Sequence, residues 1–73
     1  MALAENLKAR RIEQEMSQEE LAGYAGVTRK QIATYELGER LPSFYVGLAI
    51  AKALGITAEE LAYGTKSKRR IKK

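Results

Sequence analysis

The stretch "SQEELAGYAGVTRKQIATYELG", residues 17–38, decides the fold because it holds the starts of two helices. Ser17 with Glu20, and Thr28 with Gln31, have the residue types and the three-residue spacing of a capping box. The four residues between the two predicted helices, "AGVT", include a glycine that permits positive φ. Two short helices joined by such a turn are typical of a helix-turn-helix, although any corner between two helices satisfies the same demands.

Helix boundaries are readable on both sides of this stretch. "TAEE" at residues 57–60 is a third capping box, and Ser43 in "LPS" is a fourth helix start. A further helix covers roughly residues 3–15. Glycines stand where helix ends favour a left-handed residue, at Gly26, Gly38, Gly55 and Gly64. The sequence therefore predicts an all-α, compact five-helix domain without strands.

Helical spacing predicts which apolar residues form the core. In the fourth helix, the apolar residues at i, i+4, i+7 and i+10 are assigned to the core; these are Phe44, Leu48, Ala51 and Leu54. The predicted core consists of Leu7, Met16, Leu21, Ala22, Ala25, Val27, Ile32, Tyr35, Phe44, Leu48, Ala51, Leu54, Ile56 and Leu61.

The helix that follows Thr28 has two unlike faces. Ile32 and Tyr35 fall on one side at 100° per residue, together with Thr28. The opposite side carries a small residue, Ala33, surrounded by hydrogen-bonding side chains of Arg29, Lys30 and Thr34. A small residue lets another surface approach closely, which favours a ligand-binding face with DNA as the first candidate.

Composition excludes several classes of function. The 73 residues suffice for one domain, whose small core would gain stability from dimerisation. Cysteine and histidine are absent, which removes thiolate chemistry, the commonest general base and the commonest metal ligand. We therefore expect no enzyme activity, no metal and no cofactor. No apolar run reaches membrane-spanning length and no signal peptide is evident, so we expect a cytoplasmic protein without membrane contact.

The net charge of +4 is unevenly distributed. Residues 65–73, "TKSKRRIKK", hold six of the 13 basic residues and no acidic one, so residues 1–64 carry a net charge of −2. The sequence therefore predicts a domain at 1–64 and a disordered basic tail at 65–73, which can add affinity for nucleic acid without sequence choice.

Residues 7–61 resemble one family at many spaced positions. The pattern "SQEELAGYAGVTRKQIATYELGERLPS…LAIAKALGI…EEL" is similar to the helix-turn-helix domains of phage repressors and Cro proteins, the lambda repressor-like family. The resemblance implies a transcriptional regulator, more specifically a repressor. Such a protein binds a palindromic operator in double-stranded DNA as a homodimer, with each third helix in a major groove.

Roles carry over from the family to matching positions of this chain. The positions that match contacts to base edges are Arg29, Lys30, Ala33 and Thr34. The positions that match contacts to the DNA backbone are Gln18, Gln31 and Arg40. A family ion pair between the first helix and the end of the third matches Arg11 and Glu36.

Two features depart from the pattern or extend it. Gly47 lies inside the fourth helix, where the family usually has a larger apolar residue, and Leu37 stands where a small polar residue is common.

We expect dimerisation through the fifth helix and the end of the fourth, with Ile50, Ala58, Ala62 and Tyr63 exposed there.

Alternatives stay open at this point. The same fold serves interaction modules, such as antitoxins or adaptors, in which the tail would be an added binding segment. The operator sequence, the choice between repression and activation, and the subtype of regulator cannot be derived from the residues.

Overall fold

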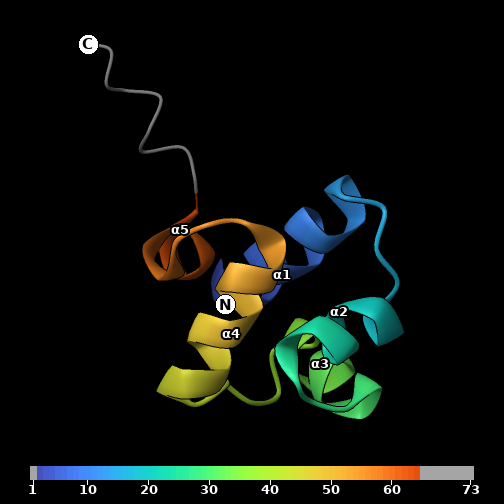
Figure 1. The fold of residues 1–73 in the computed structure, drawn as a ribbon. Helices are drawn as coiled ribbons and strands as arrows, with labels where there is room; N and C mark the ends of the chain where they lie inside the picture. The colour runs from blue at the N-terminus through green and yellow to red at the C-terminus, as the bar shows by residue number, and fades with distance from the viewer. Residues whose placement is uncertain (1, 65–73) are drawn as a thin grey trace, which may run out of the picture.

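The computed structural model describes residues 2–64, and these form five helices without a strand (Figure 1). The helices are α1 (Ala2–Glu13), α2 (Gln18–Ala25), α3 (Arg29–Glu36), α4 (Phe44–Leu54) and α5 (Ala58–Tyr63). The predicted all-α, five-helix architecture is confirmed. The predicted basic tail, residues 65–73, lies outside the described residues.

Side-chain caps begin four of the helices where the sequence predicts them. At α2 the Glu20 amide donates to Ser17 Oγ at 2.9 Å, and the Ser17 amide donates to Glu20 Oε1 at 2.8 Å. The reciprocal pair recurs between Thr28 and Gln31 at α3, and again at α5. Ser43 caps α4 with a single bond to the Val46 amide. These bonds satisfy amides that have no partner within their own helix.

Helix α1 ends at Glu13, two residues before the predicted end. Glu15 adopts a left-handed conformation with φ of 58°, and the Met16 amide donates to the Arg11 carbonyl at 3.1 Å. This is the geometry in which a left-handed residue closes a helix, here without the usual glycine. The sequence offered no glycine to mark the stop, which explains the difference.

The helix-turn-helix pair α2–α3 packs on the rest of the molecule through both of its members. Helix α2 contacts α3 and α4, α3 also contacts α1, and α5 joins α1 to α4 (Figure 1). Gly26 adopts φ of 75° at the turn between α2 and α3, as predicted. The core residues from all five helices are Leu7, Leu21, Ala22, Ile32, Tyr35, Ile50, Ala51, Leu54 and Leu61.

The predicted buried face of α4 is confirmed at Ala51 and Leu54 and wrong at Phe44 and Leu48. Phe44 is 71 % exposed and Leu48 is 39 % exposed, whereas Ile50 is fully buried beside Ala51 and Leu54. Helix α4 is apolar on every side except at Lys52, so periodicity could not single out one face. Packing against α2 and α5 selects the face.

This correction also changes the predicted dimer surface. Ile50 was expected to be exposed at the end of α4, but it belongs to the core. Tyr63 and Ala58 are exposed and Ala62 is half-buried, so α5 retains part of the apolar surface that was expected.

The remaining predicted core residues keep their places. Met16, Ala25, Val27 and Ile56 are partly buried and pack against the core cluster. Gly47 lies on the inner side of α4, and a Cβ atom there would come no closer than 4.0 Å to Pro42 Cγ. The departure from the family pattern therefore leaves room for at least one methyl group.

Candidate nucleic-acid interface

Helix α3 divides into an inner and an outer side. Ile32 is fully buried and Tyr35 is 6 % exposed, so these two residues attach the helix to the core. Arg29 and Lys30 are exposed at the beginning of the helix. Thr28, which the helical wheel assigned to the apolar side, is exposed because it serves as the N-cap.

An ion pair anchors the C-terminal end of α3 to α1. Arg11 Nε donates to Glu36 Oε2 at 2.6 Å, and Arg11 Nη2 donates to Glu36 Oε1 at 3.1 Å. Arg11 Nη1 also donates to the Met16 carbonyl at 2.7 Å. The two charged side chains are only 12 % and 4 % exposed. The hydrogen bond to Glu36 raises the pKa of Arg11 above its ordinary value, which keeps the guanidinium charged.

Gln18 extends this anchor to the start of α3. Its Nε2 atom donates to Glu36 Oε1 at 3.1 Å, while its Oε1 atom accepts from Arg29 Nη1 at 3.5 Å. Gln18 therefore links α2 to both ends of α3. Its contact with Arg29 is exposed, whereas its contact with Glu36 is partly buried.

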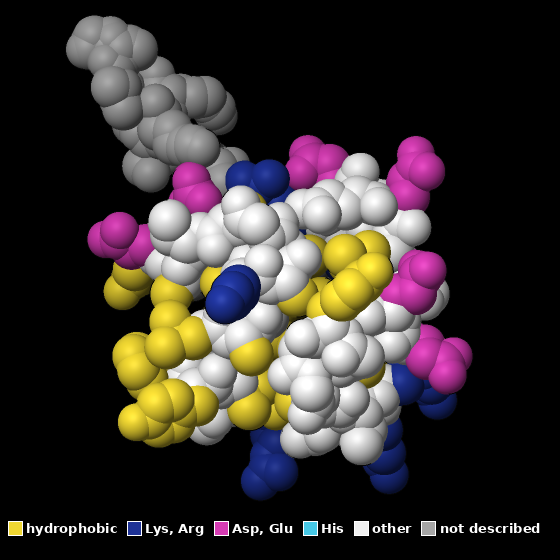
Figure 2. Space-filling model, viewed as in Figure 1, with side chains coloured by type: hydrophobic (Ala, Val, Ile, Leu, Met, Phe, Trp, Pro, Cys, Tyr) yellow, Lys and Arg dark blue, Asp and Glu magenta, His cyan; other side chains and the backbone are white. Residues whose placement is uncertain are grey.

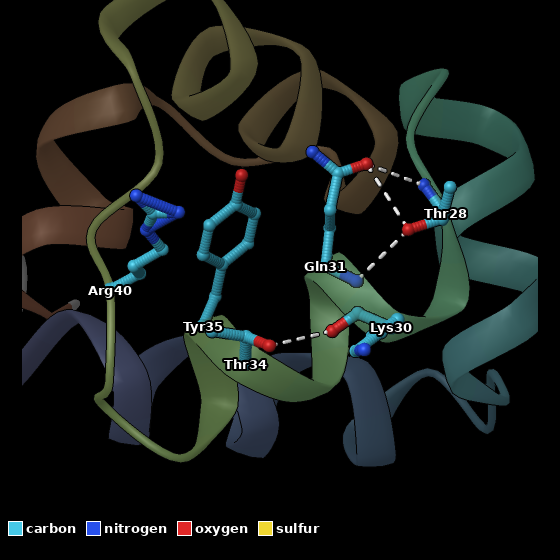
Figure 3. Close-up of a pocket in the computed structure, with 6 residues that line it drawn as sticks. All are labelled: Thr28, Lys30, Gln31, Thr34, Tyr35 and Arg40. Atoms are coloured by element: carbon cyan, nitrogen blue, oxygen red, sulfur yellow. Dashed lines mark hydrogen bonds between the residues drawn. The ribbon is translucent and has the colours of Figure 1, made fainter.

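A hollow of about 240 Å³ lies on another side of α3 (Figure 3). It lies between the start of α3 and the segment that connects α3 to α4. Its lining residues are Thr28, Lys30, Gln31, Thr34, Tyr35 and Arg40. The Thr34 hydroxyl donates to the Lys30 carbonyl at 2.9 Å, so its proton is already used within the helix.

The structure thus separates the sequence-predicted site residues into two groups. Lys30, Gln31, Thr34 and Arg40 line the hollow. Arg29 and Gln18 lie together on the anchored side of α3, and Ala33 is half-buried.

Tyr35 is the lining residue that sequence reasoning assigned to the core alone. A tyrosine at a core position, where a leucine or phenylalanine would pack equally well, was the available signal.

Charge on the visible face matches this arrangement. Figure 2 shows Lys and Arg side chains projecting from the edge of the molecule at which α3 lies. Most acidic side chains in this view project from the upper and lateral edges. The net charge of residues 1–64 is negative, but Arg29 and Lys30 are exposed on α3 and Arg40 lines the hollow beside it, which favours an anionic ligand there.

Within residues 2–64, no cluster of three potential metal-ligating side chains occurs. None of the helices in this range combines the length and the hydrophobicity that a membrane crossing requires.

Two capped helices joined by a glycine turn, with an exposed cationic start of the second helix, define a helix-turn-helix domain. The model of one helix-turn-helix family matches residues 7–61. The chain belongs to this family of DNA-binding transcriptional regulators.

Known relatives include both curated sequences and solved structures. The chain is 33 % identical over 61 residues to the uncharacterized HTH-type transcriptional regulator YqaE of Bacillus subtilis (strain 168). This match covers 84 % of the chain and 53 % of YqaE, so the chain spans about half the length of that relative.

Two solved structures share the fold at comparable identity. The P22 c2 repressor in complex with the synthetic operator 9T superposes with a TM-score of 0.83 at 30 % identity, covering 88 % of this chain and 97 % of the repressor chain. The restriction-modification controller protein C.AhdI from Aeromonas hydrophila superposes with a TM-score of 0.79 at 33 % identity, covering 82 % and 91 % of the two chains.

Proposed function

We propose that this chain regulates transcription, as a repressor, by binding a palindromic operator in double-stranded DNA as a homodimer. Helix α3 of each subunit enters a major groove. The observation that carries the proposal is the exposed cationic start of α3 on a helix that is fixed at both ends. Gln18 contacts Arg29, and the nearly buried Arg11–Glu36 pair holds the C-terminal end of α3.

The exposed side chains divide the work of recognition. Arg29 and Lys30 are long donors that can pair with guanine O6 and N7, and Ala33 can contact a thymine methyl group. Thr34 offers a hydroxyl acceptor and a methyl group, because its proton is bound to the Lys30 carbonyl. Gln18, Gln31 and Arg40 contact the backbone and set the register on DNA.

The dimer presents two copies of α3 about 34 Å apart, one turn of DNA. Tyr63 and Ala58 on α5 remain candidates for the subunit contact. Sedimentation over a range of protein concentrations, with and without operator, tests this assembly. A protein that is monomeric in both conditions contradicts it.

Two experiments test DNA binding itself. In the first, random-sequence duplex is titrated with protein at low and moderate salt, and we expect binding that weakens steeply as salt rises. In the second, bound sequences are selected from a random duplex pool, and we expect a palindrome whose half-sites lie one turn apart. Binding without any selected sequence would reduce the proposal to non-specific DNA binding.

One observation favours a second candidate, an interaction module. The beginning of α4 and the segment before it expose Leu41, Phe44, Tyr45 and Leu48, and Figure 2 shows hydrophobic side chains gathered at the corner of the molecule where α4 begins. The Phe44 and Tyr45 rings pack edge to face with centroids 5.5 Å apart. Exposed apolar clusters of this kind mark contacts with other proteins. Failure to bind any duplex at low salt would favour this reading over the first.

A further inference from the structure

The side chain of Tyr35 is buried for most of its surface, whereas its hydroxyl group reaches solvent. The residue is only 6 % exposed, yet its hydroxyl makes no hydrogen bond to any described residue. No buried side-chain nitrogen or oxygen atom in residues 2–64 lacks a partner, so this hydroxyl reaches solvent. Figure 3 shows the ring standing between Arg40 and Gln31 with the hydroxyl at its tip. A polar atom is thus held at a defined position by a buried ring and has no protein partner.

The helix cap orients the amide of Gln31 in the same hollow. Gln31 Oε1 accepts from the Thr28 amide at 2.9 Å and from Thr28 Oγ1 at 3.2 Å. Because the oxygen must face the Thr28 amide, the NH₂ group of Gln31 is turned away from the cap, toward Tyr35 (Figure 3). The capping box therefore also aims two unused donor hydrogens into the hollow.

The charged residues that line the hollow are all cations. Lys30 and Arg40 contribute two cations, and no lining residue is acidic. Neither cation forms an ion pair within residues 2–64. The available groups are thus nearly all donors. A base edge in the major groove presents donors as well as acceptors, whereas a phosphodiester presents only acceptor oxygens and a negative charge.

We propose that the hollow seats one phosphodiester of the DNA backbone, and that Tyr35 is a DNA-contacting residue. Tyr35 Oη and Gln31 Nε2 donate to its oxygens, and Arg40 supplies the positive charge. This inference rests on the proposed function, because α3 must lie in the groove for a backbone phosphate to reach the hollow. It adds a neutral, rigidly placed donor to a contact otherwise made by a long exposed arginine.

Tyr35→Phe tests the hydroxyl with the least structural change. On a duplex selected from the random pool, affinity should fall about tenfold, which corresponds to about 1.4 kcal/mol. The slope of log K against log salt should stay the same, because no charge is removed. The urea midpoint should also stay the same, since the hydroxyl has no partner in the protein. Tyr24→Phe, on α2, is the matched control, because Tyr24 is largely exposed, and it should bind as the unmodified chain does.

Gln31→Glu provides a second variant with an independent readout. Glutamate keeps the acceptor oxygen of the capping box, so α3 should still begin at Arg29. It replaces the NH₂ group with a charged oxygen, and we expect affinity to fall more than tenfold. Circular dichroism checks that helix content is retained.

A duplex series with one methylphosphonate linkage at a time locates the phosphate. One neutral linkage should weaken binding of the unmodified chain but have little further effect on Tyr35→Phe. Inorganic phosphate, titrated at constant ionic strength and followed by amide shifts of residues 28–40, should produce no saturable change. Saturable shifts, together with unchanged binding to every duplex of the methylphosphonate series, would assign the hollow to a free anion and overturn the proposal.

Two further results separate this inference from the function on which it rests. If the unmodified chain binds duplex in a salt-sensitive way and Tyr35→Phe binds equally well, only the role of Tyr35 is wrong. If the unmodified chain binds no duplex at low salt, the proposed function fails and the inference fails with it.

Discussion

Helices α3 and α4 are both short, but their attachment to the rest of the fold differs. Helix α3 packs on the core through Ile32 and Tyr35, and it also has side-chain hydrogen bonds at both ends, to Gln18 at its start and to Arg11 at its end. Helix α4 is held by apolar packing of Ile50, Ala51 and Leu54, and its first turn exposes two aromatic rings. The polar contacts of α3 favour one orientation of that helix. The apolar residues of α4, taken alone, would allow the helix to bury any of several faces.

Polar and apolar attachments differ in how precisely they orient a helix. Hydrogen bonds and ion pairs are directional, so they can hold a recognition helix at one angle. Apolar burial is non-directional and depends on area, so it can stabilise α4 without strong demands on rotation. The role proposed for α3 calls for the first kind of attachment, whereas α4, which completes the core, is stabilised by the second.

The largest effect is expected from removing one partner of the α3 anchor. Arg11→Met leaves Glu36 charged and nearly buried, and should lower the free energy of unfolding by about 3–5 kcal/mol. Urea unfolding measures this loss. Because the pKa of Arg11 is raised in the folded protein, the stability that this shift contributes is fully present below the ordinary pKa of arginine and is lost as the pH rises through the raised pKa.

Arg10→Met is the matched control for the α3 anchor. Arg10 pairs with Glu13 at 3.2 Å, but Glu13 is largely exposed, so the cost should be below about 1 kcal/mol. The double variant Arg11→Met with Glu36→Leu should regain part of the lost stability. Equal costs for Arg10→Met and Arg11→Met would mean that the anchor contributes no more than a surface ion pair.

The second-largest effect is expected from a substitution on the buried face of α4. Ile50→Ala should lower the free energy of unfolding by about 2–5 kcal/mol, because the side chain is fully buried. Phe44→Ala removes a larger side chain that is mostly exposed, and should cost about 0.5 kcal/mol or less. Thermal and urea unfolding of the two variants compare them directly. A larger loss of stability in Phe44→Ala than in Ile50→Ala would mean that α4 buries the face that the sequence pattern predicts.

The recognition surface is tested by a change in binding rather than in folding. Arg29→Ala should cost about 1–3 kcal/mol of binding free energy and relax the preference at particular base pairs. Selection from a random pool with the variant measures both. Lys52→Ala removes an exposed cation from α4 and should leave the selected sequence unchanged. A uniform loss of affinity in Arg29→Ala would make Arg29 a backbone contact.

The smallest effect is a gain of stability in α4. Gly47→Ala should raise the free energy of unfolding by about 0.5–1 kcal/mol, since alanine favours a helix interior. The added methyl group meets Pro42 only at 4.0 Å. Gly26→Ala is the contrasting variant. It should destabilise the protein, because Gly26 adopts φ of 75°. A destabilised Gly47→Ala would show that the inner side of α4 has no room.

Local signals explain most of what the sequence predicts correctly. The starts of α2, α3, α4 and α5 follow from caps that act within three residues. The end of α1 was missed, because a glutamate occupies the left-handed position there. The Arg11–Glu36 pair was expected only through family resemblance, since nothing local links residues 25 positions apart.

The sequence by itself determined that this chain forms five capped helices with a helix-turn-helix at their centre. Caps and turn glycines involve neighbours along the chain, so their energetics are written in short stretches of residues. Only the tertiary structure decided which side of α4 is buried and where the Tyr35 hydroxyl emerges. Both depend on the packing of elements that are distant in the chain. An apolar pattern states that a side chain will be buried, but its neighbours in space decide which of its atoms remain in contact with water.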